Sequence, residues 1–288
     1  MYYDAATDEI TTFDGRETAP AAATEDRFTD VEWVDAWQSG LSVGVPGVPR
    51  LLEVMHTKYG KSNWSDLFQY AIDLAENGFS FHPSTTMYIP MLYQMMGFNC
   101  SGDDLSFFRD PTAKAYFTNA DCSPKNQTMY NQDYADTLRS IASGGADDFY
   151  TGEIATNIVD AVVNDLNIPG DMSFEDLMNY EVIERPAVCA NYSREVRVCG
   201  MGPPSSGGLG VGQILGILNQ LEMMNVDVID EDEGPFDVEN IHYFTQVSIP
   251  HISHAGLVQG ITLECTTPLF VFLSCRLSDL HSQTGTCM

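Results

Sequence analysis

One scarce arginine is the residue with the clearest potential for specific chemistry. The 288-residue chain has only 13 Lys and Arg against 41 Asp and Glu. Arg16 lies in the stretch FDGRETAPAAAT, between the turn-forming pair Asp14-Gly15 and an apolar, proline-containing run. A guanidinium is always charged and offers a planar fork of donors that matches a carboxylate. Arg16 is therefore a candidate carboxylate-binding residue, and the alternative is a structural ion pair with Asp14 or Glu17.

Other polar clusters indicate a metal or anion site only weakly. The acidic run DVIDEDEGPFD (227–237) lacks the spaced glycine of a calcium loop and is typical of an exposed connection. His251 and His254 follow Pro250 and have no acidic partners nearby, and no Cys/His cluster suggests a metal. The sequence therefore predicts no metal site. The segment PPSSGG (203–208) precedes a predicted helix, where either an anion site or a purely structural helix start is chemically possible.

The cysteines and glycosylation sequons favour a eukaryotic secretory protein. Seven Cys accompany four Asn-x-Ser/Thr sequons, at Asn63, Asn99, Asn126 and Asn191. The sequence between Cys189 and Cys199 is symmetric about Arg194, so a β-hairpin would place these two cysteines opposite each other. Two further cysteines could close a loop, Cys100 and Cys122. The alternative for both pairs is small buried residues with free thiols.

The charge and hydropathy exclude several classes of function. The formal net charge is −28, and such a surface repels phosphate backbones and anionic membranes. We therefore expect no nucleic-acid partner, and the acidic surface indicates solubility or adaptation to salt. No window of 18 apolar residues occurs, so no membrane segment is predicted in this chain. The N-terminal sequence YYDAATDEITTF lacks the basic stub and apolar core of a signal peptide, so we expect that the start of the secretory precursor is missing.

The predicted elements alternate between the two classes of secondary structure, which indicates an α/β or α+β fold with several layers. A hairpin is predicted over 2–13 with its turn near Thr7-Asp8, and strands are predicted in YEVIERPAV and REVRVCG. Helices are predicted within 44–60, over 65–77, after His82-Pro83, around Leu138, around Ile158, after the Ser173/Asp176 capping box, and after PPSSGG. In 65–77 the predicted apolar face consists of Leu67, Tyr70, Ala71, Leu74 and Ala75.

The last 46 residues differ in composition from the rest of the chain. Residues 243–288 contain charges only at Glu264, Arg276 and Asp279, although 19% of the whole chain is charged. Hydrophobic periodicity disappears there as well. Because local sequence and fold agree in a foldable chain, we expect an organised segment over 1–242 and an unrelated, unstructured tail over 243–288.

Six blocks occur in a fixed order and resemble the large subunit of γ-glutamyltransferase, also called γ-glutamyltranspeptidase or glutathione hydrolase. They are FDGRETAPAAAT, GVPGVPRLLEVMHTKYG, WSDLFQYAIDLAENGF, LRSIASGGADDFYTGEIATNIVDAV, SFEDLMNYEVIERPAV and MGPPSSGGLGVGQILGIL. The resemblance runs from residue 1 to about His242. It identifies 1–242 as the central part of that large subunit, truncated at its N-terminus.

The resemblance implies a fold, a reaction and a role for Arg16. The fold would be an incomplete N-terminal nucleophile hydrolase sandwich of four layers, αββα, with mostly the helical large-subunit portion present. The reaction transfers the γ-glutamyl group of glutathione, or of another γ-glutamyl compound, to water or an amino acid. Its nucleophile is a Thr whose own α-amino group acts as base, with no metal or organic cofactor. The RE-x-AP block assigns Arg16 to the α-carboxylate of the donor.

The resemblance also implies partners and a location. The precursor cleaves itself, so a small subunit of the same precursor is the expected partner, and the intact family member is extracellular, at the cell surface or vacuolar. The family's oxyanion hole lies in that small subunit, which favours the structural role for PPSSGG, with Ser206 capping the helix and Gly207 and Gly208 allowing close backbone approach.

The sequence departs from the family where the nucleophile is expected. The Thr-Thr pairs of the chain begin at Thr11, Thr85 and Thr266, and none is followed by the His that the family has at its cleavage site. We therefore predict that this chain alone is catalytically inactive. The alternatives are a non-catalytic remnant or binding protein, and a related cephalosporin-acylase-like amidohydrolase.

Overall fold

The structure, a computed structural model, describes residues 1–96, 115–121, 123–125, 127–192 and 196–223. It divides into two compact units, one made of Met1–Phe13 with the chain from Glu184 onward and the other of Asp14–Ile183. Each unit is described separately. Several sequence predictions lie outside the described residues, namely the acidic run 227–237, the histidines 251 and 254, the tail 243–288, and Asn99, Asn126, Cys100 and Cys122.

The first unit begins with the predicted N-terminal hairpin, which is confirmed. Strands β1 (Tyr2–Asp4) and β2 (Glu9–Asp14) pair antiparallel, with Tyr3 opposite Ile10. The turn holds Asp8 at a φ of +57°, and the Tyr3 hydroxyl donates a 3.0 Å hydrogen bond to the Asp8 carboxylate. Strand β5 (Ile183–Pro186) lies beside β2 in a three-stranded sheet. The buried Thr12 hydroxyl joins them by donating to the Arg185 carbonyl.

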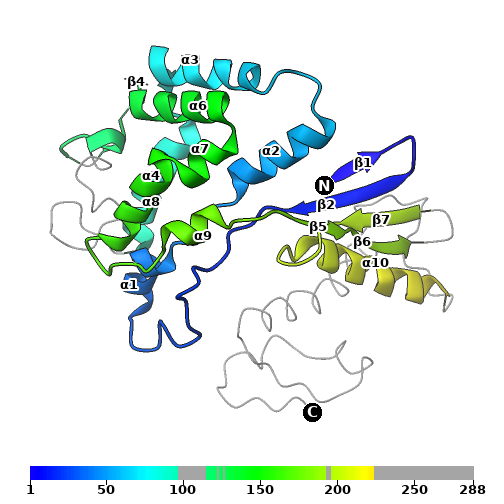
Figure 1. Cartoon of the computed structure of the whole chain (residues 1–288). Coiled ribbons are helices and arrows are strands. Elements are labelled where there is room, and N and C mark those ends of the chain that lie inside the picture. Colours follow the sequence, from blue (N-terminus) through cyan, green and yellow to red (C-terminus); the bar gives the residue numbers. More distant parts are fainter. Residues whose placement is uncertain (97–114, 122, 126, 193–195, 224–288) are drawn as a thin grey trace, which may run out of the picture. The chain divides into compact units, whose positions relative to one another are not determined.

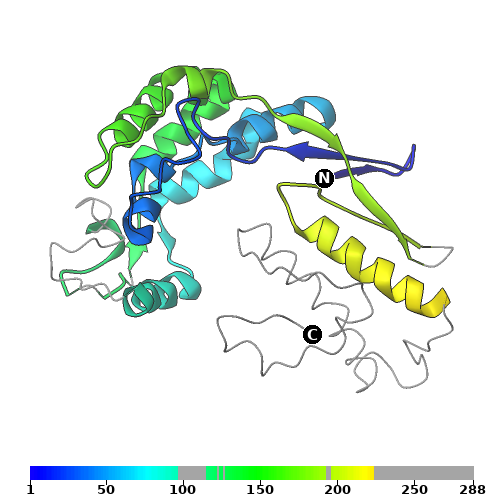
Figure 2. The same ribbon diagram turned by 90° about the horizontal axis from the view of Figure 1, so that it is seen from below.

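A second hairpin and a long helix complete this unit. Strands β6 (Val188–Tyr192) and β7 (Val196–Gly200) pair antiparallel, and the register places Cys189 opposite Cys199 as the hairpin prediction required. Their sulfur atoms form a disulfide bond. Helix α10 (Gly207–Met223) runs along this hairpin (Figure 2) and packs Leu218 near Tyr192. A Cβ atom on Gly208 would lie 2.1 Å from the Met201 carbonyl oxygen, so this glycine permits the predicted close backbone approach.

The second unit is mainly helical (Figure 1). Its short sheet pairs β3 (Phe79–Ser80) with β4 (Thr128–Met129). Its helices include α1 (Trp33–Trp37), η1 (Gly40–Ser42), α2 (Val48–Tyr59), η2 (Ser65–Phe68), α3 (Gln69–Asn77), α4 (Pro83–Met96), α6 (Gln132–Gly144), α7 (Ala146–Thr151), α8 (Glu153–Val163) and α9 (Phe174–Met178). The short helices α1 and α7 were not predicted, because five or six residues are too few to show a helical period.

Local signals explain where these helices begin and end. Pro49 lies in the first turn of α2, and the Asn131 side chain caps α6 by accepting from the Tyr134 amide. Helix α9 begins at the predicted capping box, in which the Ser173 hydroxyl accepts from the Asp176 amide and the Asp176 carboxylate accepts from the Ser173 amide.

The apolar face predicted for 65–77 is wrong at Leu67, Tyr70 and Ala71, which are exposed, and right at Ala75, which is buried. Leu67 and Tyr70 are 55% and 75% exposed, whereas Ile72 and Ala75 are 5% and 4% exposed and pack against Ala135 and Leu138 of α6. The segment starts as the 3₁₀ helix η2 and continues as α3. The buried face of α3 is the one that contacts α6, a partner that the local sequence does not show.

The main core of the second unit contacts the segment that follows β2, through Val45 and Tyr180. It is formed by Val45, Ala146, Tyr150, Ala155, Val162, Met172, Leu177 and Tyr180. These residues come from α7, α8 and α9, from the loops on either side of α9 and, in the case of Val45, from the loop between η1 and α2. Among the described residues, no helix combines the length and the apolar character needed to cross a membrane.

Candidate functional site

Arg16 lies in a loop that directly continues strand β2, and we call residues 14–21 the Arg16 loop. Its first turn is closed by the Asp14 carboxylate, which accepts a 3.1 Å hydrogen bond from the Arg16 amide. The turn passes close to helix α2, because a Cβ atom on Gly15 would lie 2.5 Å from the Leu51 Cβ atom. Glycine is therefore required at the position before Arg16 for steric reasons.

The Arg16 side chain forms the ion pair that the sequence offered as an alternative. Its Nε donates to Glu17 Oε2 and its second guanidinium nitrogen donates to Glu17 Oε1, both at 3.0 Å. The two side chains are 56% and 57% exposed. The hydrogen bond from Arg16 lowers the pKa of Glu17, and Glu17 in turn raises the pKa of Arg16. The Arg16 guanidinium thus binds one carboxylate through two parallel hydrogen bonds at a solvent-exposed position.

The backbone of Arg16 is fixed by Tyr180, which the sequence did not single out. The Tyr180 hydroxyl donates a 2.7 Å hydrogen bond to the Arg16 carbonyl oxygen. Its ring is stacked on that of Tyr150, with 5.6 Å between centroids and 10° between planes. Tyr150 is fully buried, its hydroxyl donates to the Pro46 carbonyl at 2.7 Å, and burial raises its pKa to about 12.

A short antiparallel bridge fixes the next part of the loop. The Thr18 amide donates to the Val45 carbonyl at 3.2 Å, and the Val45 amide donates to the Thr18 carbonyl at 2.8 Å. Val45 is 1% exposed and belongs to the main core. The bridge therefore connects the Arg16 loop to the most buried part of this unit.

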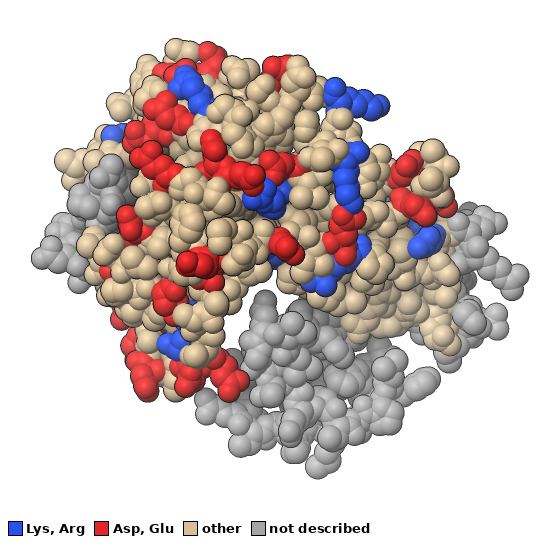
Figure 3. All heavy atoms as spheres, viewed as in Figure 1, with Lys and Arg blue, Asp and Glu red and all other residues tan. Residues whose placement is uncertain are grey.

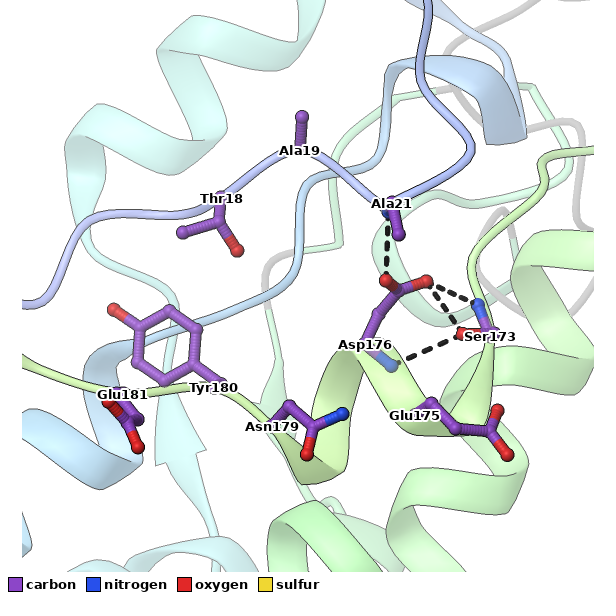
Figure 4. A pocket seen from close by; sticks show the side chains of 9 residues that line it. All are labelled: Thr18, Ala19, Ala21, Ser173, Glu175, Asp176, Asn179, Tyr180 and Glu181. Carbon is purple, nitrogen blue, oxygen red and sulfur yellow. Dashed lines mark hydrogen bonds between the residues drawn. The ribbon is translucent and has the colours of Figure 1, made fainter.

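The Asp176 carboxylate fixes the end of the loop (Figure 4). One of its oxygens accepts from the Ala21 amide at 2.8 Å, and the other accepts from the Ser173 amide and hydroxyl, both at 2.8 Å. Burial opposes ionisation of Asp176, but these hydrogen bonds outweigh it and lower the pKa of the carboxyl group. The helix cap and the loop anchor are therefore the same side chain.

A pocket of about 340 Å³ lies between this loop and helix α9. Figure 4 shows that the loop and the residues following the helix face each other across it. The pocket is lined by Thr18, Ala19, Ala21, Ser173, Glu175, Asp176, Asn179, Tyr180 and Glu181. Its charged lining residues are the acidic Glu175, Asp176 and Glu181. In Figure 3, groups of Asp and Glu are scattered over a face that is otherwise mostly uncharged. The cation nearest in sequence to the lining is Arg16, two residues before Thr18.

The other predicted site residues that the structure describes lie far from the Arg16 loop in the sequence. Asn63 is exposed, and its side-chain amide donates a 3.1 Å hydrogen bond to Asp66. Asn191 is also exposed; it lies in β6, opposite Arg197 of β7. Within the described ranges, no three His, Cys, Asp or Glu side chains are grouped in a way that could hold a metal ion.

Sequence reasoning missed the supports of Arg16 because each lies far away along the chain. Tyr180 is 164 residues from Arg16, and the anchor in Asp176 is 155 residues from Ala21. The capping box did reveal the local bond of Asp176 to Ser173. No local pattern could reveal that the second oxygen of the same carboxylate has another partner.

Comparison with known proteins identifies relatives of both sequence and fold. The family described as Gamma-glutamyltranspeptidase matches residues 1–250. Scoloptoxin SSD14 of Scolopendra dehaani is 32% identical over 234 residues, which are 80% of this chain and 38% of that protein. The glutathione hydrolase proenzyme of Bacillus subtilis (strain 168) is 29% identical over 247 residues, which are 84% of this chain and 40% of that protein.

Solved structures share the fold. The crystal structure of Helicobacter pylori gamma-glutamyltranspeptidase is 26% identical and superposes with a TM-score of 0.72, covering 93% of this chain and 72% of that one. Cephalosporin acylase from Bacillus halodurans is 25% identical, with a TM-score of 0.56 over 72% of this chain and 37% of that one. The predicted fold class is thereby confirmed. The chain spans about two fifths of the length of the two curated relatives.

Proposed function

This chain belongs to the gamma-glutamyltranspeptidase family, and from that membership we propose that it supplies the donor-carboxylate site of an enzyme that transfers or hydrolyses the γ-glutamyl group of glutathione. The observation that carries the proposal is the Arg16 loop. An arginine in the RE-x-AP block follows a strand, and its backbone is held by Asp14, Tyr180 and the Thr18 bridge while its side chain stays exposed.

The role of Arg16 follows from the geometry of its fork. It already holds the Glu17 carboxylate through two bonds, which is the arrangement that a donor α-carboxylate would take. The pair with Glu17 is exposed and screened by solvent, so it contributes little to stability. An incoming α-carboxylate can therefore replace Glu17 at low cost, provided that the loop keeps the fork in place.

The remaining chemistry belongs to a small subunit. In the proposed reaction a Thr hydroxyl oxygen bonds to the γ-carbonyl carbon of the donor, and the amide C–N bond breaks. The Thr α-amino group accepts the hydroxyl proton and passes it to the leaving amine. Water or an acceptor amine then attacks the acyl carbon and loses a proton to the Thr α-amino group; the ester C–O bond breaks, and that proton returns to the Thr oxygen. The residues of this chain bind and orient the donor, and without a Thr-Thr-His sequence the chain alone is inactive.

A chimeric enzyme tests this proposal. Residues 1–242 replace the aligned part of the Bacillus subtilis proenzyme, and release of nitroaniline from γ-glutamyl-p-nitroanilide is measured. We expect the chimeric enzyme to cleave itself and to release nitroaniline, and the 288-residue chain alone to do neither. A chimeric enzyme that folds and cleaves itself but has no activity above a buffer blank would disprove the proposal.

The sequons and cysteines support a secretory location for the intact protein. Asn63 and Asn191 are exposed, as glycan acceptors must be. The cross-strand disulfide between Cys189 and Cys199 suits an oxidising compartment. We therefore extend the proposal to a glycoprotein that is extracellular, at the cell surface or vacuolar, as the family resemblance implies.

A second candidate is a cephalosporin-acylase-like amidohydrolase. The structural similarity to the Bacillus halodurans enzyme favours it, although that similarity covers less of this chain than the one to the Helicobacter pylori enzyme. The same chimeric enzyme separates the two candidates, because an acylase of this kind would hydrolyse a cephalosporin side-chain amide in preference to the γ-glutamyl anilide.

A further inference from the structure

We propose that Tyr180 is a positioning residue for Arg16, and that its hydroxyl sets the place of the guanidinium fork through the Arg16 backbone. The effect on substrate rests on the proposed function of Arg16. The positioning itself does not, and it can be measured without any substrate.

The contact is direct. The Tyr180 hydroxyl donates to the carbonyl oxygen of Arg16 itself, at 2.7 Å, so the bond acts on the peptide unit that follows the Arg16 Cα atom. The Tyr180 hydroxyl is also close to Gly47. A Cβ atom on Gly47 would lie 2.0 Å from the Tyr180 oxygen and 2.4 Å from the Gly15 carbonyl oxygen, so the loop, the tyrosine and Gly47 meet with no spare room.

The ring of Tyr180 cannot easily change position. Tyr180 is 6% exposed and belongs to the main core, where it is stacked on Tyr150. The guanidinium of Arg50 covers the Tyr150 ring, 4.9 Å from its centroid, and is itself paired with Glu53 and Asp147. A fixed column of side chains from helices α2 and α7 thus supports the hydroxyl that holds Arg16.

The Tyr180 hydroxyl remains protonated, and so remains a hydrogen-bond donor, over the whole neutral pH range. Burial raises the pKa of Tyr180, and the negative charges of Asp14 and Glu17 raise it further. A protonated hydroxyl can donate to a carbonyl, whereas a phenolate could not. The two acidic side chains beside Arg16 therefore help to keep its backbone anchor in the donating form.

The first test is hydrogen exchange on the full 288-residue chain. Tyr180→Phe removes one oxygen and keeps the stacked ring. Loss of one neutral hydrogen bond should speed exchange of the Arg16, Thr18 and Ala21 amides about 2- to 10-fold. Tyr70→Phe is the matched control, because the Tyr70 side chain is 75% exposed. Unchanged exchange of the Arg16 loop in a folded Tyr180→Phe chain would overturn the proposal.

The second test uses the chimeric enzyme and two donors. The γ-glutamyl anilide has the α-carboxylate, and the 4-aminobutyryl anilide is the same donor without it. For Tyr180→Phe we expect KM for the first donor to rise roughly 2- to 10-fold with kcat nearly unchanged, and KM for the second to stay the same. An equal rise for both donors would contradict positioning of Arg16, because a general loss of structure affects both.

These outcomes separate the positioning of Arg16 from its function. If Arg16→Ala fails to discriminate between the two donors, the proposed function is wrong, whatever Tyr180 does. If Arg16→Ala discriminates and Tyr180→Phe leaves both exchange and KM unchanged, the function stands and the positioning role of Tyr180 is wrong.

Discussion

Replacing Asp176 should show that one carboxylate stabilises two distant parts of the second unit. Asp176→Ala removes the acceptor of the Ala21 amide and, at the same time, half of the capping box of α9. Ser173→Ala removes the cap and leaves the bond to Ala21 in place. Asp176→Ala therefore loses, in addition, the bonds that its carboxylate accepts from the Ala21 and Ser173 amides, and the difference between the two variants measures these two bonds together.

The magnitude follows from the bonds that are lost. A hydrogen bond to a charged group contributes about 1.5–3 kcal/mol, and an N-cap side chain contributes about 0.5–2 kcal/mol. Because Asp176 is only partly buried, we use the lower part of these ranges and expect Asp176→Ala to lower the free energy of unfolding by roughly 2–4 kcal/mol. Ser173→Ala should cost roughly 0.5–2 kcal/mol.

The pH dependence gives an independent test of the same bond. The folded state lowers the pKa of Asp176 below its usual value of 3.8. Its stabilisation is therefore fully present above that value and is lost as the pH falls through the lower, folded-state pKa. The gap in unfolding free energy between wild type and Asp176→Ala should be largest at neutral pH and should shrink below pH 3.8.

Urea unfolding of the full chain at neutral and acidic pH measures these differences. Equal costs of Asp176→Ala and Ser173→Ala at neutral pH would refute a stabilising contribution from the bonds to the Ala21 and Ser173 amides. A gap that stayed constant with decreasing pH would refute the assignment of the effect to an ionised carboxylate.

Four further substitutions test other parts of the structure. Gly47→Ala should cost roughly 1–3 kcal/mol of stability by overpacking, whereas Gly216→Ala, where a Cβ atom meets nothing within 4 Å, should be neutral or stabilising in the same urea assay. Cys199→Ser should cost about 2–4 kcal/mol, and equal stability under non-reducing conditions would argue against the disulfide. Asn63→Gln, expressed in a eukaryotic secretory host, should lose one glycan by mass spectrometry, and an unchanged mass pattern would contradict glycosylation there.

Local sequence patterns were sufficient to predict elements that are determined by contacts between residues close together in the sequence. The hairpin of β1 and β2 has a turn at Asp8, and α9 begins where the Ser173 capping box predicts it. The register that places Cys189 opposite Cys199 followed from the symmetry of the intervening residues. Each of these features depends on contacts within about a dozen residues, which a linear pattern can encode.

Features with distant or irregular causes could not be predicted in this way. The buried face of α3 is set by its contact with α6, which lies much later in the chain, so the sequence alone assigned part of that face wrongly. The site shows the same limit. Arg16 was identified from its own motif, but its supports come from Tyr180, Val45 and Asp176, which only the folded chain brings beside it.

The most direct measurement of the central claim compares the two donors in the chimeric enzyme with and without the Arg16 side chain. Removing a charged partner from a bound carboxylate costs roughly 2–5 kcal/mol, so Arg16→Ala should lower kcat/KM for the γ-glutamyl anilide by about 30-fold to several thousand-fold. Arg16→Lys should be intermediate because it keeps the charge and loses the fork. For the 4-aminobutyryl anilide, Arg16→Ala should have little effect. An equal loss for both donors, in a chimeric enzyme that still folds and cleaves itself, would mean that Arg16 serves only as the structural partner of Glu17.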